Sequence, residues 1–375
     1  MHPSVTTVRV TEPAEILALV PHRLGFRPRE SLVAVSLRPR GRVGVVARVD
    51  LAQLSDPVDG ADRARALTTL LDRDGATRVL AVVYTDDDPR DVDAHLAHRA
   101  VELLREAADA PFGEVVAWVV TSTGYLALDC RDGCCPPGGR PLRDLDATQV
   151  GAELVLAGSA VADSRADVAT IRPAGAERRR SVARVRRRWE ARRDEAAQSG
   201  EEARARWRLE SVAAWRAAVS HACSGPSRGA APWGRLEAGL ADRRVRDSIL
   251  VALVPGTGEL AERCVRGAAA SPRDEAALAS AVAAILDPAC AVPPPVVATR
   301  VHEDVLEHVV AHGRAGHQAP ALTLLALLAW WRGDGARASV LLDRALGDDG
   351  GYRLALLLTG LLEAGIGPGW TRREA

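Results

Sequence analysis

The pattern of apolar residues changes once along the chain, near residue 145. Before this point, short apolar runs alternate with segments whose apolar residues recur at helical spacing. From Thr148 onward, only the helical spacing recurs. Strands that alternate with helices are typical of an α/β domain, and a series of helices alone is typical of an all-α region. We therefore expect an N-terminal α/β domain, with a mixed sheet and flanking helices, followed by an all-α C-terminal region.

Five apolar and β-branched runs predict the strands of the sheet. Ser31–Leu37 and Arg42–Leu51 are separated by a short segment with Pro and Gly, so they predict a hairpin. Val79–Tyr84 is a continuous apolar run between charged residues, which is typical of a buried parallel strand. Val115–Val120 and Tyr125–Leu128 predict a second hairpin around a Thr-Gly turn. Helices are expected between these strands, over residues 61–71 and 89–107.

The end of the chain resembles a tetratricopeptide repeat in its spacing. Leu322 and Leu325 lie on a predicted first helix, Gly333 lies in the turn, and Ala338 and Leu342 lie on a second helix. Only one such unit is visible, which is too few for a free-standing solenoid. The sequence therefore predicts that the all-α region ends in a tetratricopeptide-like helical hairpin, packed as a cap on the preceding helices.

The length of 375 residues exceeds the usual size of one hydrophobic core, so several domains are expected. Pro293-Pro294-Pro295 interrupts the helical series, because the residue before each proline is driven out of the helical conformation. We predict an α/β domain over residues 1–145, a helical region over 146–292 and the tetratricopeptide-like C-terminal region over 293–375.

Charge and hydropathy limit the classes of partner and the location. The formal net charge is +0, and the chain has no Lys, so all 49 basic residues are Arg. The Arg-rich segment 177–193 is followed at once by acidic residues and has one aromatic residue, so we interpret it as a solvated helix face and expect no nucleic-acid partner. The first ten residues lack a signal-peptide pattern, and the longest apolar run, Ala319–Trp331, is 13 residues, against the roughly 20 that span a membrane. We expect a cytoplasmic protein with no membrane contact.

Asp129–Leu142 holds three of the six cysteines, Cys130, Cys134 and Cys135, beside a run of Pro and Gly. Three thiolates are one ligand short of a structural zinc site, which usually has four. Zinc is nevertheless the candidate cofactor, bound by Cys130, Cys134 and Cys135, with Asp129, Asp132, His95 or His98 as the fourth ligand. The alternative without chemistry is a buried, tight connection that closes the sheet, since free cysteines are mostly small buried hydrophobic residues.

A reactive thiol is the third interpretation of this segment. Arg131 and Arg140 flank the cysteines, and a neighbouring positive charge stabilises a thiolate. Cys134 or Cys135 would then be the catalytic or redox residue, attacking an electrophile or a disulfide. The three interpretations of the cysteines, structural, metal-binding and reactive, stay open at this point.

A second candidate site lies around the first predicted strand. Arg27, Arg29 and Ser31 lie close together just before and at its start, and Arg48 and Asp50 end its hairpin partner. The guanidinium groups of Arg27 and Arg29 and the hydroxyl of Ser31 suit an anionic ligand, and Arg48 and Asp50 could lie beside them. The competing explanation is structural, because Gly25 and Pro28 in the same segment are typical of a helix end and a turn. A Walker A loop and a G-x-G-x-x-G motif are both absent from the sequence.

Two further groups of polar residues have ordinary explanations. Asp86, Asp87 and Asp88 follow the predicted strand Val79–Tyr84; they suit a divalent cation, but acidic residues are also favoured at the start of a helix. His308 and His312 are four residues apart on one helix face without an H-E-x-x-H motif, so we interpret them as partly exposed histidines.

Several short segments together resemble one protein family. They are Leu19-Val20-Pro21, Leu24-Gly25-Phe26, Pro28, Ser31-Leu32-Val33, Ala47-Arg48-Val49-Asp50, Cys130, Cys134-Cys135-Pro136, Gly139 and Pro141. This combination closely resembles the actinobacterial family called domain of unknown function 4192. The resemblance spans most of the chain and implies a cytoplasmic actinobacterial protein with an α/β part followed by a helical part. It implies no activity.

The residues and the resemblance together predict a protein of unknown activity with a regulatory or interaction role. Its α/β domain would bind a ligand or partner, and its helical C-terminal region would contact a protein partner or a second copy. The alternative is an enzyme or redox protein that uses a cysteine of the Cys130, Cys134 and Cys135 cluster.

Overall fold

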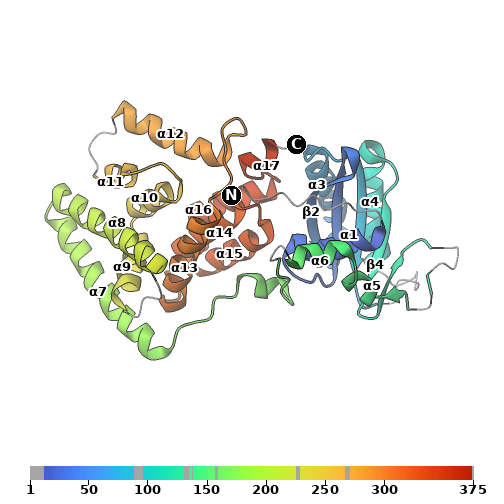
Figure 1. Ribbon diagram of the computed structural model, residues 1–375, viewed down its shortest axis with the longest axis horizontal. Coiled ribbons are helices and arrows are strands. Elements are labelled where there is room, and N and C mark those ends of the chain that lie inside the picture. Colours follow the sequence, from blue (N-terminus) through green and yellow to red (C-terminus); the bar gives the residue numbers. More distant parts are fainter. Residues whose placement is uncertain are drawn as a thin grey trace. The chain divides into compact units, whose positions relative to one another are not determined.

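The computed structural model describes residues 12–87, 96–130, 135–136, 138–156, 159–224, 229–266 and 271–373. The chain forms two compact units, Met1–Val168 and Ala169–Ala375 (Figure 1). The first unit contains the sheet and the second is helical, which confirms the predicted α/β part followed by an all-α part. The domain boundaries at 145 and 292 stay predictions.

The α/β unit alternates strands and helices in the predicted order. Its elements are α1 (Pro13–Leu24), β1 (Ser31–Arg38), the 3-10 helix η1 (Pro39–Gly41), β2 (Arg42–Asp50), α2 (Leu51–Leu54), α3 (Gly60–Arg73), β3 (Arg78–Tyr84), α4 (Leu96–Phe112), β4 (Val116–Val120), β5 (Gly124–Ala127), β6 (Arg140–Pro141), α5 (Arg143–Asp146) and α6 (Gln149–Leu156). A second 3-10 helix, η2 (Arg165–Ala169), follows at the end of this unit.

The six strands form one mixed sheet in the order β2-β1-β3-β4-β5-β6. β1 is antiparallel to both β2 and β3, whereas β3 and β4 are parallel and are connected through α4. The two predicted hairpins, β1–β2 and β4–β5, are therefore confirmed, and so is the parallel pairing of the run Val79–Tyr84.

The sheet has helices on both faces. Successive side chains of a strand point to opposite faces, and Leu32 and Ala34 of β1 belong to a buried cluster with residues of α2, α3 and α4. The opposite face carries the alternate residues Val33 and Val35, which are also buried. On that side α1 packs against α5, α6 and β2. The side chains that alternate with Leu32 and Ala34 therefore point to the α1 face of the sheet.

The second unit is built from helices alone in the part of the chain that the structure describes. They are α7 (Ala176–Gln198), α8 (Glu201–Ser224), α9 (Ala231–Leu240), α10 (Arg243–Leu253), α11 (Leu260–Val265), α12 (Pro272–Leu286), α13 (Val296–His312), α14 (Ala319–Trp331), α15 (Gly335–Asp348), α16 (Arg353–Glu363) and α17 (Gly369–Arg373).

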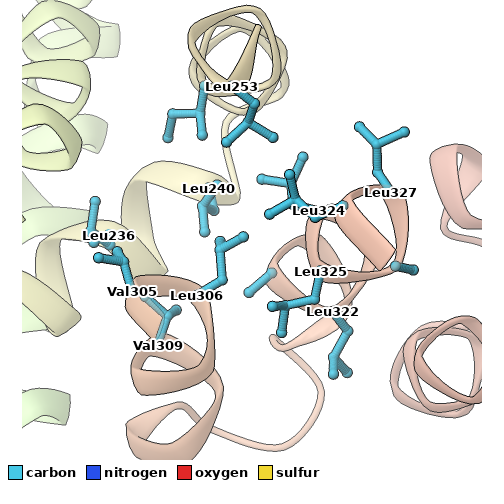
Figure 2. Packing of buried hydrophobic residues seen from close by; sticks show 14 of the residues in the cluster. Leu236, Leu240, Leu253, Val305, Leu306, Val309, Leu322, Leu324, Leu325 and Leu327 are labelled. Atoms are coloured by element: carbon cyan, nitrogen blue, oxygen red, sulfur yellow. The ribbon is translucent and has the colours of Figure 1, made fainter. Parts of the chain in front are cut away.

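One hydrophobic core extends through the helical unit, from Val182 on α7 to Leu358 on α16. Its centre is built largely from leucine and valine side chains of α9, α10, α13 and α14, which meet in Figure 2. Because α14 is buried on all sides, it shows little amphipathic pattern despite being a helix. Residues before and after position 292 contribute to the same cluster.

The predicted helical hairpin at the end of the chain is formed by α14 and α15, which pack on each other with Gly333 in the turn at φ 84°. Asp348, the last residue of α15, accepts hydrogen bonds from the backbone N–H groups of Gln318 at 2.6 Å and Ala319 at 2.9 Å. This carboxylate therefore ties the end of the second helix to the start of the first. No helix in the described residues has the length and apolar character needed to cross a membrane.

Candidate ligand site at the carboxyl edge of the sheet

One edge of the sheet collects the carboxyl ends of β2, β3 and β4 together with the start of β1. Ser31 begins β1 and is paired with Asp50 on β2 and with Tyr84 on β3. Paired residues on neighbouring strands point to the same face, so these three side chains form a row on the α1 face. Arg48 is two residues before Asp50 and also points to that face.

Three buried polar atoms in this group have no hydrogen-bond partner among the described residues. They are the Ser31 Oγ, the Arg48 Nε and the Tyr84 hydroxyl oxygen. Ser31 is 0% exposed and Tyr84 is 7% exposed. A buried donor without a partner costs about 1–3 kcal/mol, and native proteins rarely leave such groups unpaired. Three of them on one face and at one edge make this a candidate site, where a ligand or a water molecule would complete the hydrogen bonding.

All three groups can donate a hydrogen bond. Burial raises the pKa of the Tyr84 phenol, so its hydroxyl stays protonated at neutral pH. The Arg48 Nε–H and the Ser31 O–H are donors as well. The site thus presents donors to a ligand that supplies acceptor oxygens.

Arg48 is held in place by its second terminal nitrogen. Arg48 Nη2 forms an ion pair with Asp50 Oδ1 and donates a hydrogen bond to the Arg29 carbonyl at 3.4 Å. The Arg48 side chain is 16% exposed, whereas Asp50 is 40% exposed. Asp50 therefore contacts the terminal nitrogen Nη2 of Arg48. The Nε atom of the same guanidinium group is buried and has no partner among the described residues.

The loops at this edge are joined by carboxylates. Glu30 has a positive φ of 39°, which is uncommon for a residue with a side chain. Its carboxylate accepts hydrogen bonds from Thr85 Oγ1 and from the Asp86 backbone N–H, both at 3.3 Å. Asp86 in turn accepts a hydrogen bond from the Ser122 backbone N–H at 2.9 Å. Glu30 and Asp86 therefore tie the loops before β1, after β3 and after β4 to one another around the buried donors.

The predicted anion site is only partly assembled here. Ser31, Arg48 and Asp50 lie together, and Arg29 joins them through its carbonyl group. Arg27 has an exposed side chain, and its backbone N–H donates to the Ala162 carbonyl at 2.9 Å. Asp86 has a structural role between loops, and Asp88 lies outside the described residues.

Two of the three clustered cysteines lie in the described part of the chain. Cys135 is 9% exposed and belongs to the buried cluster that contains residues of α2, α3 and α4. Cys130 packs against the same cluster. Cys134 lies outside the described residues. Within the described residues no three His, Cys, Asp or Glu side chains gather as a metal site. The burial of Cys135 supports the structural interpretation of this residue, and the metal and thiol interpretations stay predictions.

Tyr84 and Glu30 are the residues of this edge that sequence reasoning missed. Tyr84 is the last residue of a continuous apolar run, so its sequence context predicts only a buried strand residue. A tyrosine that ends a buried strand nevertheless brings a hydroxyl to the sheet edge. Glu30 lies inside the segment 25–31, whose two arginines predict an anion site, and an acidic residue does not fit that prediction. The positions of Tyr84 and Glu30 at this edge depend on the pairing of β1 with β3, and the local sequence carries no information about that pairing.

A model of one protein family matches most of the chain. The family is described as a domain of unknown function, DUF4192, and its model matches residues 13–298 and 290–369. No curated protein and no solved structure matches the chain. The predicted family resemblance is therefore confirmed across both units.

Proposed function

The chain belongs to the family described as domain of unknown function DUF4192, and we propose that it is a regulatory or interaction protein whose α/β unit binds a small anionic ligand. The ligand occupies the carboxyl edge of the sheet and is held by Ser31, Arg48 and Tyr84. A single observation carries this proposal, namely that these three buried polar groups, on one face and at one edge, have no hydrogen-bond partner among the described residues.

The chemistry of the three groups defines the ligand class. Three donors and one permanent positive charge match an oxyanion, either a phosphate or a carboxylate. Arg48 and Asp50 form an ion pair with no net charge, so the ligand would be held mainly by the donated hydrogen bonds and by the orientation of the guanidinium group. The carboxyl edge of the central strands is also where sheets flanked by helices commonly bind ligands.

Titration calorimetry of the full chain with inorganic phosphate, and separately with succinate, tests the proposal. We expect saturable binding of one of the two anions at millimolar or lower concentration. Arg48→Gln removes a charged hydrogen bond worth about 1.5–3 kcal/mol and should weaken binding by about tenfold or more. Tyr84→Phe removes a neutral hydrogen bond and should weaken it by a smaller factor.

Arg42→Gln is the matched control, because Arg42 begins the same strand at the opposite edge and is exposed. It should leave anion binding unchanged. A second expectation concerns the free protein: Ser31→Ala and Tyr84→Phe remove unpaired buried hydroxyls, so neither should lower the free energy of unfolding without ligand. Equal anion binding by Arg48→Gln and Arg42→Gln, or the absence of saturable binding of both anions, would count against the proposal.

The interaction role rests on apolar side chains that the helical unit exposes. Leu278 and Val282 are one turn apart on α12 and are 40% and 41% exposed. Val297, at the start of α13, is 78% exposed. Sedimentation velocity of the titration samples, with and without the bound anion, tests self-association through these exposed side chains. A monomer at every concentration and in both states would leave only a different protein as the partner.

A further inference from the structure

β2 forms one edge of the sheet, and its outer side has no strand beside it in the part of the chain that the structure describes. It is nine residues long, whereas the opposite edge ends in the two-residue strand β6. Proteins commonly protect a sheet edge with a very short strand, a proline or a lysine. β6 is such a short strand, but β2 contains neither proline nor lysine. The β2 edge is therefore the one at which another strand can add to the sheet.

One hydrogen bond fixes which backbone groups of β2 bond to β1. The Leu51 N–H donates to the Glu30 carbonyl oxygen at 3.0 Å, and these two residues lie opposite each other at the end of the pairing. In an antiparallel pair, every second residue bonds to the neighbouring strand. Counting back from Leu51, Val49 and Ala47 therefore use their N–H and C=O groups in bonds to β1.

Val46 and Arg48 alternate with these residues and direct their N–H and C=O groups away from β1. Among the described residues, these backbone groups have no hydrogen-bond partner. The register with β1 is regular over this stretch, and the bulge in the pairing lies nearer the start of β2. Val46 and Arg48 thus present a regular set of donors and acceptors to an added strand.

The side chains of this stretch are apolar except for one charge. Ala47 is opposite Ala34 and packs against the buried cluster on the α2 face, but is itself only half-buried. Val46 and Arg48 lie on the α1 face. Arg48 is the one charged residue between positions 45 and 49. The position of this charge therefore decides how a second copy of the strand can pair.

Two antiparallel copies of β2 can be related by a twofold axis in two registers that use the outward groups. An axis at Arg48 places the two Arg48 side chains directly opposite each other, and like charges in that arrangement are destabilising. An axis at Ala47 pairs Val46 of each copy with Arg48 of the other, and every outward N–H and C=O group of these residues then has a partner. The two Ala47 side chains face each other, and their small size permits close approach of the strands.

We propose that two copies of the chain form a dimer through β2, with antiparallel strands centred on Ala47, so that the two sheets join into one. The contact is isologous, which means that both copies use the same surface. It adds a defined contact to the interaction role proposed above and does not depend on anion binding. Because one short pair of strands buries little surface, the dimer is weak and its population rises with concentration.

Oxidative cross-linking of the full chain tests the register. In the dimer the two Ala47 residues form a non-hydrogen-bonded pair with Cα atoms about 4.5 Å apart, which a disulfide can span. Ala47→Cys should therefore give a covalent dimer linked through residue 47, identified by mass spectrometry of the linked peptide.

Val49→Cys is the matched control for the cross-link. Val49 lies on the same face two residues further along β2. The two Val49 positions of the dimer lie on opposite sides of the axis, more than about 10 Å apart, which a disulfide cannot span. If Ala47→Cys gives no more linkage through its new cysteine than Val49→Cys does, the proposal is wrong.

A charge at position 46 gives a second test that adds no cysteine. Val46 is opposite Arg48 of the other copy, twice in each dimer, so Val46→Glu should tighten the dimer and Val46→Arg should weaken it. The dimer Kd of Val46→Arg should exceed that of Val46→Glu by at least about tenfold, as measured by sedimentation velocity. Both variants place a charge at the same half-buried position, and circular dichroism checks that both are folded.

Other occupants of the β2 edge give different results. If a segment of the same chain or a different protein pairs with β2, the wild type stays a monomer over the whole concentration range and Ala47→Cys is not linked through residue 47. That outcome overturns the proposal. A dimer with equal Kd in Val46→Glu and Val46→Arg also overturns it, because self-association would then use another surface, such as the exposed apolar side chains of the helical unit.

Discussion

Asp74 follows α3 and connects it to the β1–β2 hairpin through its carboxylate. The carboxylate accepts hydrogen bonds from Ser36 Oγ at 2.6 Å, from Arg38 Nε at 3.0 Å and from the Val45 backbone N–H at 2.9 Å, and it also pairs with Arg38 Nη2. The Asp74 side chain is 6% exposed. Gly44 is required beside it, because a Cβ at that position would clash with Asp74 Oδ2.

Asp74→Ala should lower the free energy of unfolding of the α/β unit by about 3 kcal/mol, because it leaves the partly buried Arg38 without its partner. Urea denaturation followed by circular dichroism measures this change. Asp62→Ala is the control, since Asp62 lies on the same helix in an exposed ion pair with Arg65 and should change stability by at most about 0.5 kcal/mol. Equal effects of the two substitutions would contradict the role assigned to Asp74.

Arg186 is a buried arginine whose burial the local sequence does not predict. It lies in the Arg-rich segment 177–193, whose charge pattern predicts a solvated face, and most arginines of this segment are exposed as predicted. Arg186 itself is 6% exposed and forms an ion pair with the buried Glu237 at 3.0 Å. The partner is on α9, 51 residues away in the sequence. Burial of one arginine among many depends on this contact, and local charge pattern carries no information about it.

Elements with a strong local pattern are the ones that sequence analysis identified. β1, β2 and β3 contain the continuous apolar runs and were predicted nearly to the residue. The two-residue strand β6 and the four-residue helices α2 and α5 were missed, because elements this short form through contacts with neighbours. In the candidate site, Ser31, Arg48 and Asp50 follow from the predicted hairpin, whereas Tyr84 follows from the pairing of β1 with β3.

Asp242 separates two helices in a segment whose apolar spacing alone predicts one. That spacing favours a single helix over residues 236–254, whereas the structure has two, α9 and α10. Asp242 is extended, with ψ at 121°, and caps α10 by accepting hydrogen bonds from the Arg244 and Val245 backbone N–H groups at 2.9 and 3.2 Å. Arg208 from α8 also pairs with it at 3.0 Å. Asp242, within a segment of helical apolar spacing, thus caps the start of α10 and is ion-paired with Arg208 of α8.

Asp242→Ala should lower the free energy of unfolding of the helical unit by about 1–2 kcal/mol through loss of the cap. Thermal or urea denaturation of the variant measures the loss. Asp59→Ala provides a comparison, because Asp59 occupies the same position before α3 but makes no side-chain capping bond. If Asp242→Ala is no more destabilising than Asp59→Ala, the break between α9 and α10 does not depend on this cap.

The two units have separate hydrophobic cores and respond to acid through different residues. All members of the helical core lie from Ala169 onward, and all members of the α2, α3 and α4 cluster lie in the first unit. In the first unit, burial raises the pKa of Asp74, but hydrogen bonds from Arg38, Ser36 and Val45 outweigh it and lower the pKa below the usual value of 3.8. The stability from Asp74 is therefore present above about pH 4 and is lost as the pH falls further.

In the helical unit, His302 is a buried histidine that responds to mild acid. It is 9% exposed and packs on Trp215, with 5.7 Å between the ring centres. Burial, with a smaller effect of Arg216, lowers its pKa from 6.5 to about 4. The unfolded chain then binds a proton between these values and the folded unit does not, so stability falls as the pH decreases from about 6.5 to about 4, by roughly 3 kcal/mol.

Glu303 acts in the opposite direction. Burial raises its pKa above 4.5 despite the neighbouring Arg332 and Arg337 charges, so the folded unit takes up a proton there more readily than the unfolded chain and gains stability in acid. The net acid response of the helical unit is therefore smaller than the His302 contribution alone. A variant that removes only the histidine separates the two.

His302→Phe keeps an aromatic ring against Trp215 and removes the titrating group. We expect the wild-type helical unit to become less stable between pH 6.5 and 4.5, and the variant to be less sensitive to pH over the same range, because the unfolded chain no longer gains a proton at this position. Tryptophan fluorescence follows unfolding of this unit, since seven of the eight tryptophans lie after residue 168. Asp74→Ala should leave that pH dependence intact, because Asp74 belongs to the other unit and titrates below this range. An identical pH dependence in the wild type and His302→Phe would show that His302 is protonated equally in both states.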